Sequence, residues 1–513
     1  MIDRVVEIDG GPLRVEDVVA VAREGAPVRL TPRSVELMLR SRAVVEDAVR
    51  EGRVEYGITT GFGALSDVRV PDDELEAMQL SLVRSHAAGV GKPLEVEVVR
   101  AMLLLRARTL ATGYSGVRPL VAEGLVEMLN RKVHPVVPEQ GSVGSSGDLA
   151  QLAHLALPLV GEGEAVVHGR RMRGAEAMGL AGLEPIELSY KEGLALVNGT
   201  EGMLAIGCLA LTDAETLART ADVVCAMTIE GLHGTDRPFD PRLHALRPHP
   251  GQQLSAENLR RLLAGSPIVE SHRHSDHAVQ DAYSLRCAPQ VHGACRDVIS
   301  YARGVFEREL ASVADNPLVF SETGEVLTNG NFHGEPLGFA LDFLAQALAE
   351  LGSISERRSD RMLDPTHSEG LPPFLTERPG LGSGFMLAQY TQAALVAENR
   401  LLASPATVDT IPTSGTKEDH VAMGWNAAIK LRRVIANLSR IMAIEAMCAA
   451  QSLELREPDP APGTAAALAV VREHCAPLTD DRVIGTDIEE LATELVESGR
   501  LADAAAAAIG GLR

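Results

Sequence analysis

Long segments rich in alanine and leucine dominate the second part of this 513-residue chain. After Lys191 they recur at about residues 201–231, 290–313, 335–358, 383–403 and 418–453. Helices of this length gain most of their stability by packing an apolar face against a neighbour, so a bundle is their natural arrangement. Aromatic residues make up only 3% of the sequence, which favours aliphatic helix packing over a β-rich architecture. We therefore predict a mainly α fold.

The first part of the chain has shorter helical patterns and glycine-punctuated loops. One helix is expected from about Ser34 to Glu51, and the loop Tyr56-Gly-Ile-Thr-Thr-Gly-Phe-Gly63 follows it. We predict a smaller N-terminal domain over residues 1–197. Residues 198–513 are predicted to form the central bundle of long helices, together with the C-terminal helices.

Charge and cysteine usage exclude several classes of protein. The net charge of −22 argues against a surface that binds nucleic acid or an anionic membrane. The six cysteines are scattered without a CxxC pair, which indicates free thiols in a reducing compartment. The sequence shows no apolar signal segment at Met1 and no run of about 18 uncharged apolar residues. We expect a cytoplasmic protein that does not cross a membrane.

The segment Gly141-Ser-Val-Gly-Ser-Ser-Gly-Asp148 carries no bulky side chain before Asp148, and an apolar helical pattern then begins. One interpretation is a glycine-rich turn that ends in an Asp N-cap. A second is an anion-binding nest at a helix N-terminus. Neither the P-loop pattern nor the dinucleotide-binding glycine pattern fits this segment, so phosphate binding is weakly supported.

A third interpretation of this segment is chemical. The amide nitrogen of Gly147 lies two residues after the carbonyl carbon of Ser145, and glycine is the residue least hindered for attack in a tight turn. If that ring closes and Ser146 loses water, the Ser146 side chain becomes a methylene conjugated to carbonyls. The backbone alone would then supply an electrophile.

Other polar segments interrupt the helical pattern. Tyr283 and Arg286 are three residues apart and share a face if their segment is helical. Such a tyrosine can act as a general base and the arginine can bind a carboxylate, although a capped helix with a solvated arginine is the commoner case. Asn198 could bond a carboxylate or an oxyanion. The segment Pro412–His420 opens a long helix, where acidic residues have an ordinary dipole explanation.

Three histidines, His272, His274 and His277, crowd one short segment. No carboxylate or cysteine set accompanies them, so we expect no metal site.

These segments, in their order from Tyr56 to His420 and with the further block Phe374–Arg400, resemble the histidine and phenylalanine ammonia-lyase family. The Ala-Ser-Gly triad of that family matures to 4-methylidene-imidazol-5-one (MIO). The resemblance implies that Ser145, Ser146 and Gly147 form MIO here and that no external cofactor is needed. Ser145 departs from the usual alanine, but the ring uses its carbonyl. The resemblance also implies a mostly helical homotetramer in which three subunits share each active site.

The resemblance assigns a role to individual residues. Tyr283 is similar to the base that removes the β-proton, and Arg286 to the group that binds the substrate carboxylate. Tyr56 is similar to the loop tyrosine that faces the substrate amine. Whether the electrophile captures the amine or the ring stays open. The remaining pocket positions implied by the resemblance are Asn198, Gln280, Asn316 and Phe332.

Two positions bear on the substrate. His86, next to Ser85, suits a polar ring, and Glu418 resembles the glutamate that can hold an imidazole N–H. Two departures point away from histidine: Thr59, where asparagine is usual, and Lys417, where glutamine is usual. The resemblance implies elimination of ammonia from L-histidine to give trans-urocanate, with a tyrosine ammonia-lyase or an aminomutase as the alternative. A non-enzymatic alternative is a helical scaffold whose uncyclised loop only binds anions.

Overall fold

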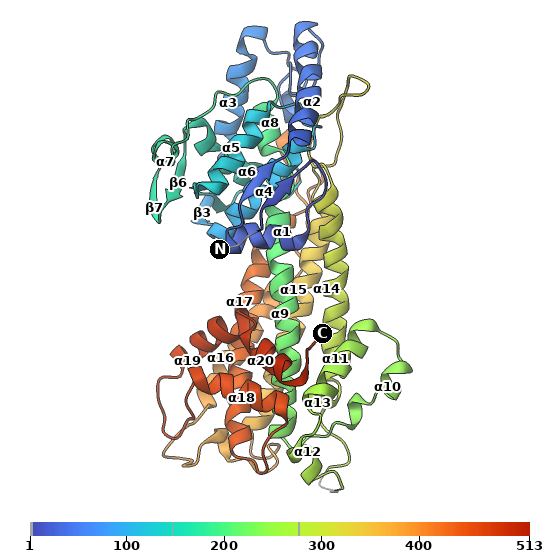
Figure 1. Ribbon diagram of the computed structural model, residues 1–513, viewed down its shortest axis with the longest axis vertical. Helices are drawn as coiled ribbons and strands as arrows, with labels where there is room; N and C mark the ends of the chain where they lie inside the picture. The colour runs from blue at the N-terminus through green and yellow to red at the C-terminus, as the bar shows by residue number, and fades with distance from the viewer. Residues whose placement is uncertain (1–3, 146, 275–277) are drawn as a thin grey trace. The chain divides into compact units, whose positions relative to one another are not determined.

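The computed structural model describes residues 4–145, 147–274 and 278–513 (Figure 1). The prediction of a mainly α fold is confirmed, because helices account for most elements and the strands are short. Contacts between residues divide the chain into two compact units. The first unit comprises Met1–Leu209, Arg303–Asp342 and Pro405–Ile429, and the second comprises Ala210–Ala302, Phe343–Ser404 and Lys430–Arg513.

The predicted boundary at residue 197 lies near Leu209, where the first stretch of the first unit ends. The prediction did not anticipate that residues 303–342 and 405–429 return to the first unit. Most of these boundaries between the units fall inside long helices that run from one unit into the other. A boundary inside a helix interrupts no helical pattern, so the sequence does not reveal it. Those helices are α9 (Glu201–Gly231), α14 (Ala288–Ala311), α15 (Glu335–Leu363) and α17 (Gly424–Glu454).

The first unit contains several short helices around α4 (Val96–Ala111), which is buried along almost its whole length. Its arginines are buried with partners: Arg100 donates to the carbonyl of Val21 at 2.7 Å, and Arg106 to that of Asn198 at 2.9 Å. The other helices wholly within this unit are α1 (Val15–Val19), α2 (Pro32–Arg50), α3 (Leu75–His86), α5 (Pro119–Asn130), α6 (Leu149–Ala156), α7 (Gly174–Leu180) and α8 (Glu192–Val197). Helix α2 starts where sequence chemistry places it, because the Thr31 side chain caps it and Pro32 occupies its first turn.

The first unit also contains small β-sheets of two or three short strands. Strand β1 (Val6–Ile8) pairs in parallel with β2 (Val28–Leu30), with Val6 opposite Val28. In Figure 1 the hairpin of β6 (Glu164–Val167) and β7 (Arg170–Arg173) lies beside α7, and β6 also pairs with β4 (His134–Pro135). The remaining antiparallel pairs are β3 (Val90–Pro93) with β5 (Pro138–Gln140), and β8 (Leu318–Phe320) with β9 (Glu325–Leu327).

The second unit has a fully buried polar network among its long helices. Glu445 accepts hydrogen bonds from Thr228 at 2.9 Å and Ser355 at 2.6 Å, and it pairs with Arg358. His292 bridges Arg358 and the carboxylate of Asp222. The helices wholly within this unit are α10 (Pro241–Ala245), α11 (Pro250–Leu262), α12 (Pro267–Ser271), α13 (Tyr283–Arg286), α16 (Met386–Leu402), α18 (Pro462–His474), α19 (Gly485–Leu491) and α20 (Arg500–Ile509).

Helix α15 is long and apolar enough to cross a membrane, judged by length and composition. Most of its apolar window, 61%, is nevertheless buried against the rest of the protein. A helix whose apolar surface is mostly packed inside the protein fits a core position, and we interpret α15 as a core helix.

Candidate active site

The segment that precedes α6 is shaped by glycine. Gly147 adopts a φ of +74°, and a Cβ built on it would lie 2.0 Å from the carbonyl oxygen of Gly199. The amide of Asp148 donates to that same oxygen at 2.7 Å. No residue with a side chain fits at position 147, which agrees with the requirement for glycine in the proposed cyclisation. Ser146, the residue predicted to become the methylene, lies outside the described residues.

Hydrogen bonds fix the described residues of this segment from several sides. The hydroxyl of Ser142 accepts from the Gly144 amide at 2.9 Å and donates to the Gly147 carbonyl at 3.2 Å. The Gly144 carbonyl accepts from Gly334 at 3.0 Å. The hydroxyl of Ser145 accepts from the Ala422 amide at 2.7 Å. These contacts fix Ser145 and Gly147, and the Gly147 backbone leaves no room for a side chain, so the two described residues fit an MIO-forming tripeptide.

Asp148 occupies the N-cap position of α6 but does not cap that helix. Its carboxylate instead accepts from the amide of Met203, in the first turn of α9, at 2.8 Å. The interpretation of Asp148 as an N-cap is therefore wrong, because its side chain makes no capping hydrogen bond to α6 and binds the start of α9 instead. Complete burial raises the pKa of Asp148 to about 8, although the Met203 amide acts in the opposite direction.

A cavity of about 550 Å³ opens beside α6 in the first unit. It brings together predicted site residues from separate parts of the sequence, namely Tyr56, His86, Asn198, Asn316, Phe332 and Glu418. Leu149, the residue after Asp148, also lines it, so the cavity reaches the end of the glycine-rich segment. The lining also includes Lys417, three hydroxyl-bearing residues and apolar side chains such as Phe62, Leu82 and Leu194.

His86 is the last residue of α3 and is half-buried. Its Nδ1 lies 3.0 Å from the carbonyl oxygen of Leu82. Because a carbonyl only accepts, Nδ1 carries the proton and Nε2 is left as an acceptor. Burial lowers the pKa of His86 despite the Leu82 carbonyl and the nearby Glu418 carboxylate. The ring is therefore a neutral acceptor at neutral pH.

Glu418 lies in the loop before α17, more than 300 residues after His86 in the sequence. Its carboxylate accepts from the hydroxyl of Thr413 at 2.8 Å, and the same two residues exchange backbone hydrogen bonds. Together with His86, this side chain gives the cavity an acceptor pair suited to a ring that carries N–H or O–H groups.

Tyr56 lies in the loop after α2, and its phenol oxygen accepts from the Gly63 amide at 3.2 Å. Burial raises the pKa of Tyr56, and the Glu418 carboxylate raises it further. This phenol is protonated at neutral pH and is a hydrogen-bond donor rather than a general base.

The two asparagines of the cavity are locked to one another. Asn198 donates through Nδ2 to the Asn316 carbonyl at 3.1 Å, and the side-chain oxygen of Asn316 accepts from the Asn329 amide at 2.9 Å. Asp315, directly before Asn316, forms an ion pair at 2.7 Å with Lys191, seven residues before Asn198, and both side chains are fully buried.

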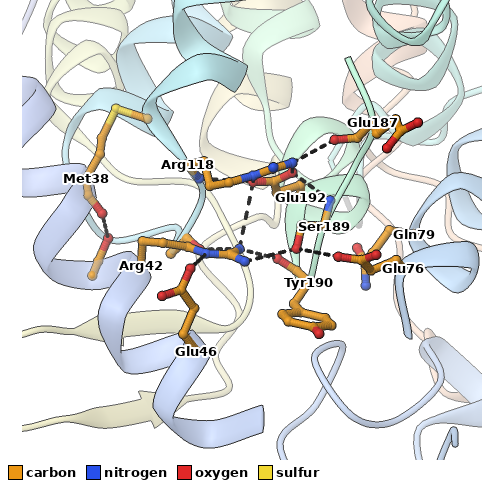
Figure 2. A network of polar contacts seen from close by, with 12 residues as sticks. Met38, Arg42, Glu46, Glu76, Gln79, Arg118, Glu187, Ser189, Tyr190 and Glu192 are labelled. Atoms are coloured by element: carbon orange, nitrogen blue, oxygen red, sulfur yellow. Dashed lines mark hydrogen bonds and ion pairs between the residues drawn. The ribbon is translucent and has the colours of Figure 1, made fainter. Parts of the chain in front are cut away.

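A second layer of polar residues supports α8, which leads to Asn198. Figure 2 shows Arg42 and Arg118 converging on the fully buried Glu192 at the start of α8. Arg118 makes the closer contacts, at 2.7 and 2.8 Å. Behind this layer, the buried amide of Gln79 on α3 donates to the Gly57 carbonyl and accepts from the Leu194 amide, at 3.3 and 3.1 Å.

Three predicted site residues belong to the second unit and do not line this cavity: Gln280, Tyr283 and Arg286. Tyr283 is 70% exposed, and the Arg286 guanidinium lies over its ring at 4.4 Å. The segment is helical, as α13, which meets the condition for Tyr283 and Arg286 to share one face. Their roles toward a substrate stay predictions.

The histidine-rich segment gives no metal site among the residues that the structure describes. The ring of His272 lies 3.0 Å from the Gly234 carbonyl, and His277 lies outside the described residues.

Sequence reasoning missed the supporting residues of the cavity. Gln79 and Glu192 are buried, and only their polar character in helices otherwise expected to pack apolar faces marked them. Thr59, interpreted as a departure relevant to the substrate, is fully buried and does not line the cavity. Its hydroxyl donates to the Arg53 carbonyl at 2.8 Å and closes the turn that carries Tyr56. Thr59 is therefore a structural residue.

Comparisons with known proteins agree on one family. The sequence pattern of the aromatic amino acid lyase family matches residues 13–473. Histidine ammonia-lyase of Gloeobacter violaceus is 56% identical over 506 residues, which cover 98% of each chain. The histidine ammonia-lyase structure from Trypanosoma cruzi superposes with a TM-score of 0.90 at 41% identity, covering 98% of this chain and 95% of that one. Tyrosine aminomutase from Streptomyces globisporus superposes with a TM-score of 0.93 at 39% identity, covering 99% and 100%.

Proposed function

The chain belongs to the aromatic amino acid lyase family, and we propose that it is a histidine ammonia-lyase that converts L-histidine into trans-urocanate and ammonia. The observation that carries the choice of substrate is the pairing of His86 and Glu418 in one cavity beside the Ser145–Gly147 segment. The relatives support this choice, since proteins named histidine ammonia-lyase are 53–56% identical to this chain over 98% of its length.

The reaction removes a β-proton and breaks the bond between Cα and nitrogen. The electron pair of the C–H bond becomes the new double bond, and ammonia carries away the nitrogen. The β-proton is weakly acidic and ammonia is a poor leaving group, so both barriers are high. MIO, formed from Ser145, Ser146 and Gly147, would supply the electrophile that lowers them. The Gly147 backbone and the buried Ser145 described above support this assignment.

Residues of the cavity bind and orient the substrate in this proposal. Glu418 accepts the imidazole N–H, and charge-assisted hydrogen bonds of this kind contribute about 1.5–3 kcal/mol. His86 offers a second acceptor through Nε2. Tyr56 donates its phenol proton toward the amino group, and Asn198, Asn316 and Phe332 fix the position of the substrate chain.

Tyr283, Arg286 and Gln280 complete the active site from neighbouring subunits of a homotetramer. Tyr283 then acts as the base for the β-proton, and Arg286 binds the carboxylate. The exposure of Tyr283 supports this arrangement, as do large exposed apolar side chains on α16, namely Leu387, Tyr390 and Leu401. We place the enzyme in the cytoplasm, in agreement with its free cysteines.

The substrate assignment is tested by incubating the pure enzyme separately with L-histidine, L-tyrosine and L-phenylalanine. Ultraviolet absorbance of the conjugated acrylate follows each reaction, and urocanate should form fastest. Glu418→Gln should lose activity on histidine preferentially, because a site built around a polar contact penalises its loss strongly. Faster formation of coumarate, or accumulation of a β-amino acid, would instead support a tyrosine ammonia-lyase or an aminomutase.

Intact mass distinguishes the enzyme from the non-enzymatic scaffold. Maturation removes two waters per chain, and Ser146→Ala should lack this loss and all turnover. An unmodified mass in the purified wild-type protein would support the scaffold with an uncyclised, anion-binding loop.

A further inference from the structure

The hydroxyl of Ser145 joins two parts of the site that are far apart in the sequence. Its Oγ accepts from the Ala422 amide at 2.7 Å. Ser145 is 3% exposed and Ala422 is fully buried, so water does not replace this hydrogen bond if the hydroxyl is removed. A buried amide that loses its acceptor carries the full cost of desolvation.

The segment on the other side of this bond contains Glu418. Its two ends are tied together, because the Val421 amide donates to the hydroxyl of Thr410 at 2.8 Å. Within it, Thr413 holds the Glu418 backbone and carboxylate. Residues 410–422 therefore form a closed loop, which we call the selector loop. Its last residue is anchored on Ser145, four residues after Glu418.

A second contact fixes the start of the following helix. The indole nitrogen of Trp425 donates to the Glu139 carbonyl at 2.7 Å. A Cβ atom added to Gly144 would lie 2.9 Å from the backbone nitrogen of Gly424, so the two backbones pass close together. The start of α17 is thus held by Trp425, whereas Ser145 anchors the last residue of the selector loop. Two longer contacts, at 3.3 Å each, join Ser414 to the Ala64 amide and the His420 carbonyl to the His333 ring.

We propose that the Ser145 hydroxyl is a positioning group for substrate recognition: it fixes Glu418 at a set distance from the tripeptide Ser145–Gly147. The proposal rests on the proposed function, because it assigns Glu418 to the substrate ring. Ring closure would use the Ser145 carbonyl and leave its hydroxyl free for this task. Alanine at position 145 would cyclise equally well but would leave the selector loop without this anchor.

The test separates binding from maturation by using Ser146→Ala protein, which neither matures nor turns over. In that background we measure the dissociation constant of L-histidine by calorimetry, with and without Ser145→Ala. Loss of one hydrogen bond should weaken binding by about 3- to 10-fold. Ser439→Ala is the matched control, because it removes a buried hydroxyl that donates to the Ile435 carbonyl in α17. This control should leave histidine affinity unchanged.

Two further measurements show whether Ser145 acts through Glu418. In the maturing enzyme, Ser145→Ala should raise KM more than it lowers kcat, while intact mass still shows loss of two waters. In a Glu418→Gln background, Ser145→Ala should add little further loss, because coupled residues give non-additive effects. If Ser145→Ala protein folds poorly, Thr410→Val replaces it in the test. That substitution removes the hydrogen bond that closes the selector loop, and it should give a similar loss of affinity.

Unchanged affinity, or additive losses with Glu418→Gln, would overturn the positioning role. A wild-type enzyme that matures but prefers tyrosine would contradict the proposed substrate instead. The two failures are therefore distinguishable.

Discussion

At the scale of single residues, Asp148 shows how burial couples a side chain to pH. Its carboxylate is completely buried, and burial raises its pKa to about 8. The folded protein keeps this proton where the unfolded chain, with an ordinary aspartate, has released it. The contribution of Asp148 to stability is therefore greatest below the unfolded pKa and declines as pH rises toward about 8.

Asp148→Asn should remove that dependence on pH, because asparagine keeps an oxygen for the Met203 amide and cannot ionise. Denaturant unfolding of both proteins at several pH values between about 4 and 9 measures the difference. We expect the free energy of unfolding of wild type, relative to Asp148→Asn, to fall as pH rises. A constant difference across this range would show that Asp148 is ionised in the folded protein.

Tyr283 is the residue with the largest expected effect on the chemistry. Tyr283→Phe should lower kcat about 10²- to 10⁴-fold, the usual contribution of a general acid–base group. Because the side chain is 70% exposed, the substitution should leave the melting temperature nearly unchanged. Steady-state kinetics with histidine and a thermal scan check both statements. A change of only a few-fold would remove Tyr283 from the role of base.

At the scale of elements, the sequence predicts helices well where their length depends on packing alone. The segment predicted at 201–231 is α9 (Glu201–Gly231), and that at 335–358 begins at the observed residue of α15. Helix α17 starts at Gly424 rather than at residue 418, because Met423, directly before it, adopts a positive φ of +52°. Such backbone conformations in non-glycine residues depend on tertiary contacts, so local propensity does not reveal them.

The candidate site, like the helices, could be predicted only in part. Motifs identified the residues of the cavity, but spacing alone could not reveal the layer that holds them. Gln79 is an example, because its buried amide connects the backbone of the Tyr56 loop to α8. In the sequence it is only a polar residue that interrupts the helical pattern of apolar residues.

Gln79→Leu should therefore impair catalysis as well as stability. The substitution keeps the volume but leaves the Leu194 amide without this acceptor, at a cost of about 1–3 kcal/mol in unfolding free energy. Because Tyr56 and Asn198 then lose a common support, kcat/KM for histidine should fall as well. Gln392→Leu is the matched control, since its buried amide donates to the Ile441 carbonyl in the second unit. Equal effects of both substitutions on kcat/KM would contradict the positioning role of Gln79.

At the scale of the whole molecule, the described chain divides the predicted machinery between its two units. The cavity and the Ser145–Gly147 segment belong to the first unit, whereas Gln280, Tyr283 and Arg286 belong to the second. The predicted boundary at residue 197 indicated only part of this division, because it also assigned Asn316, Phe332 and Glu418 to the second domain, whereas they belong to the first unit. The proposed homotetramer resolves it by supplying the second set from neighbouring subunits.

Complementation between inactive subunits tests that arrangement. Ser146→Ala and Tyr283→Phe chains are co-expressed with different affinity tags, and the mixed assemblies are purified on both tags. If one active site takes Ser146 from one subunit and Tyr283 from another, each site draws these residues from two independently chosen chains. Random mixing then restores about a quarter of the sites. If both residues came from the same subunit, no mixed assembly would be active. Wild type mixed with the doubly substituted chain sets the scale, since it should give about a quarter under the shared arrangement and about half under the unshared one.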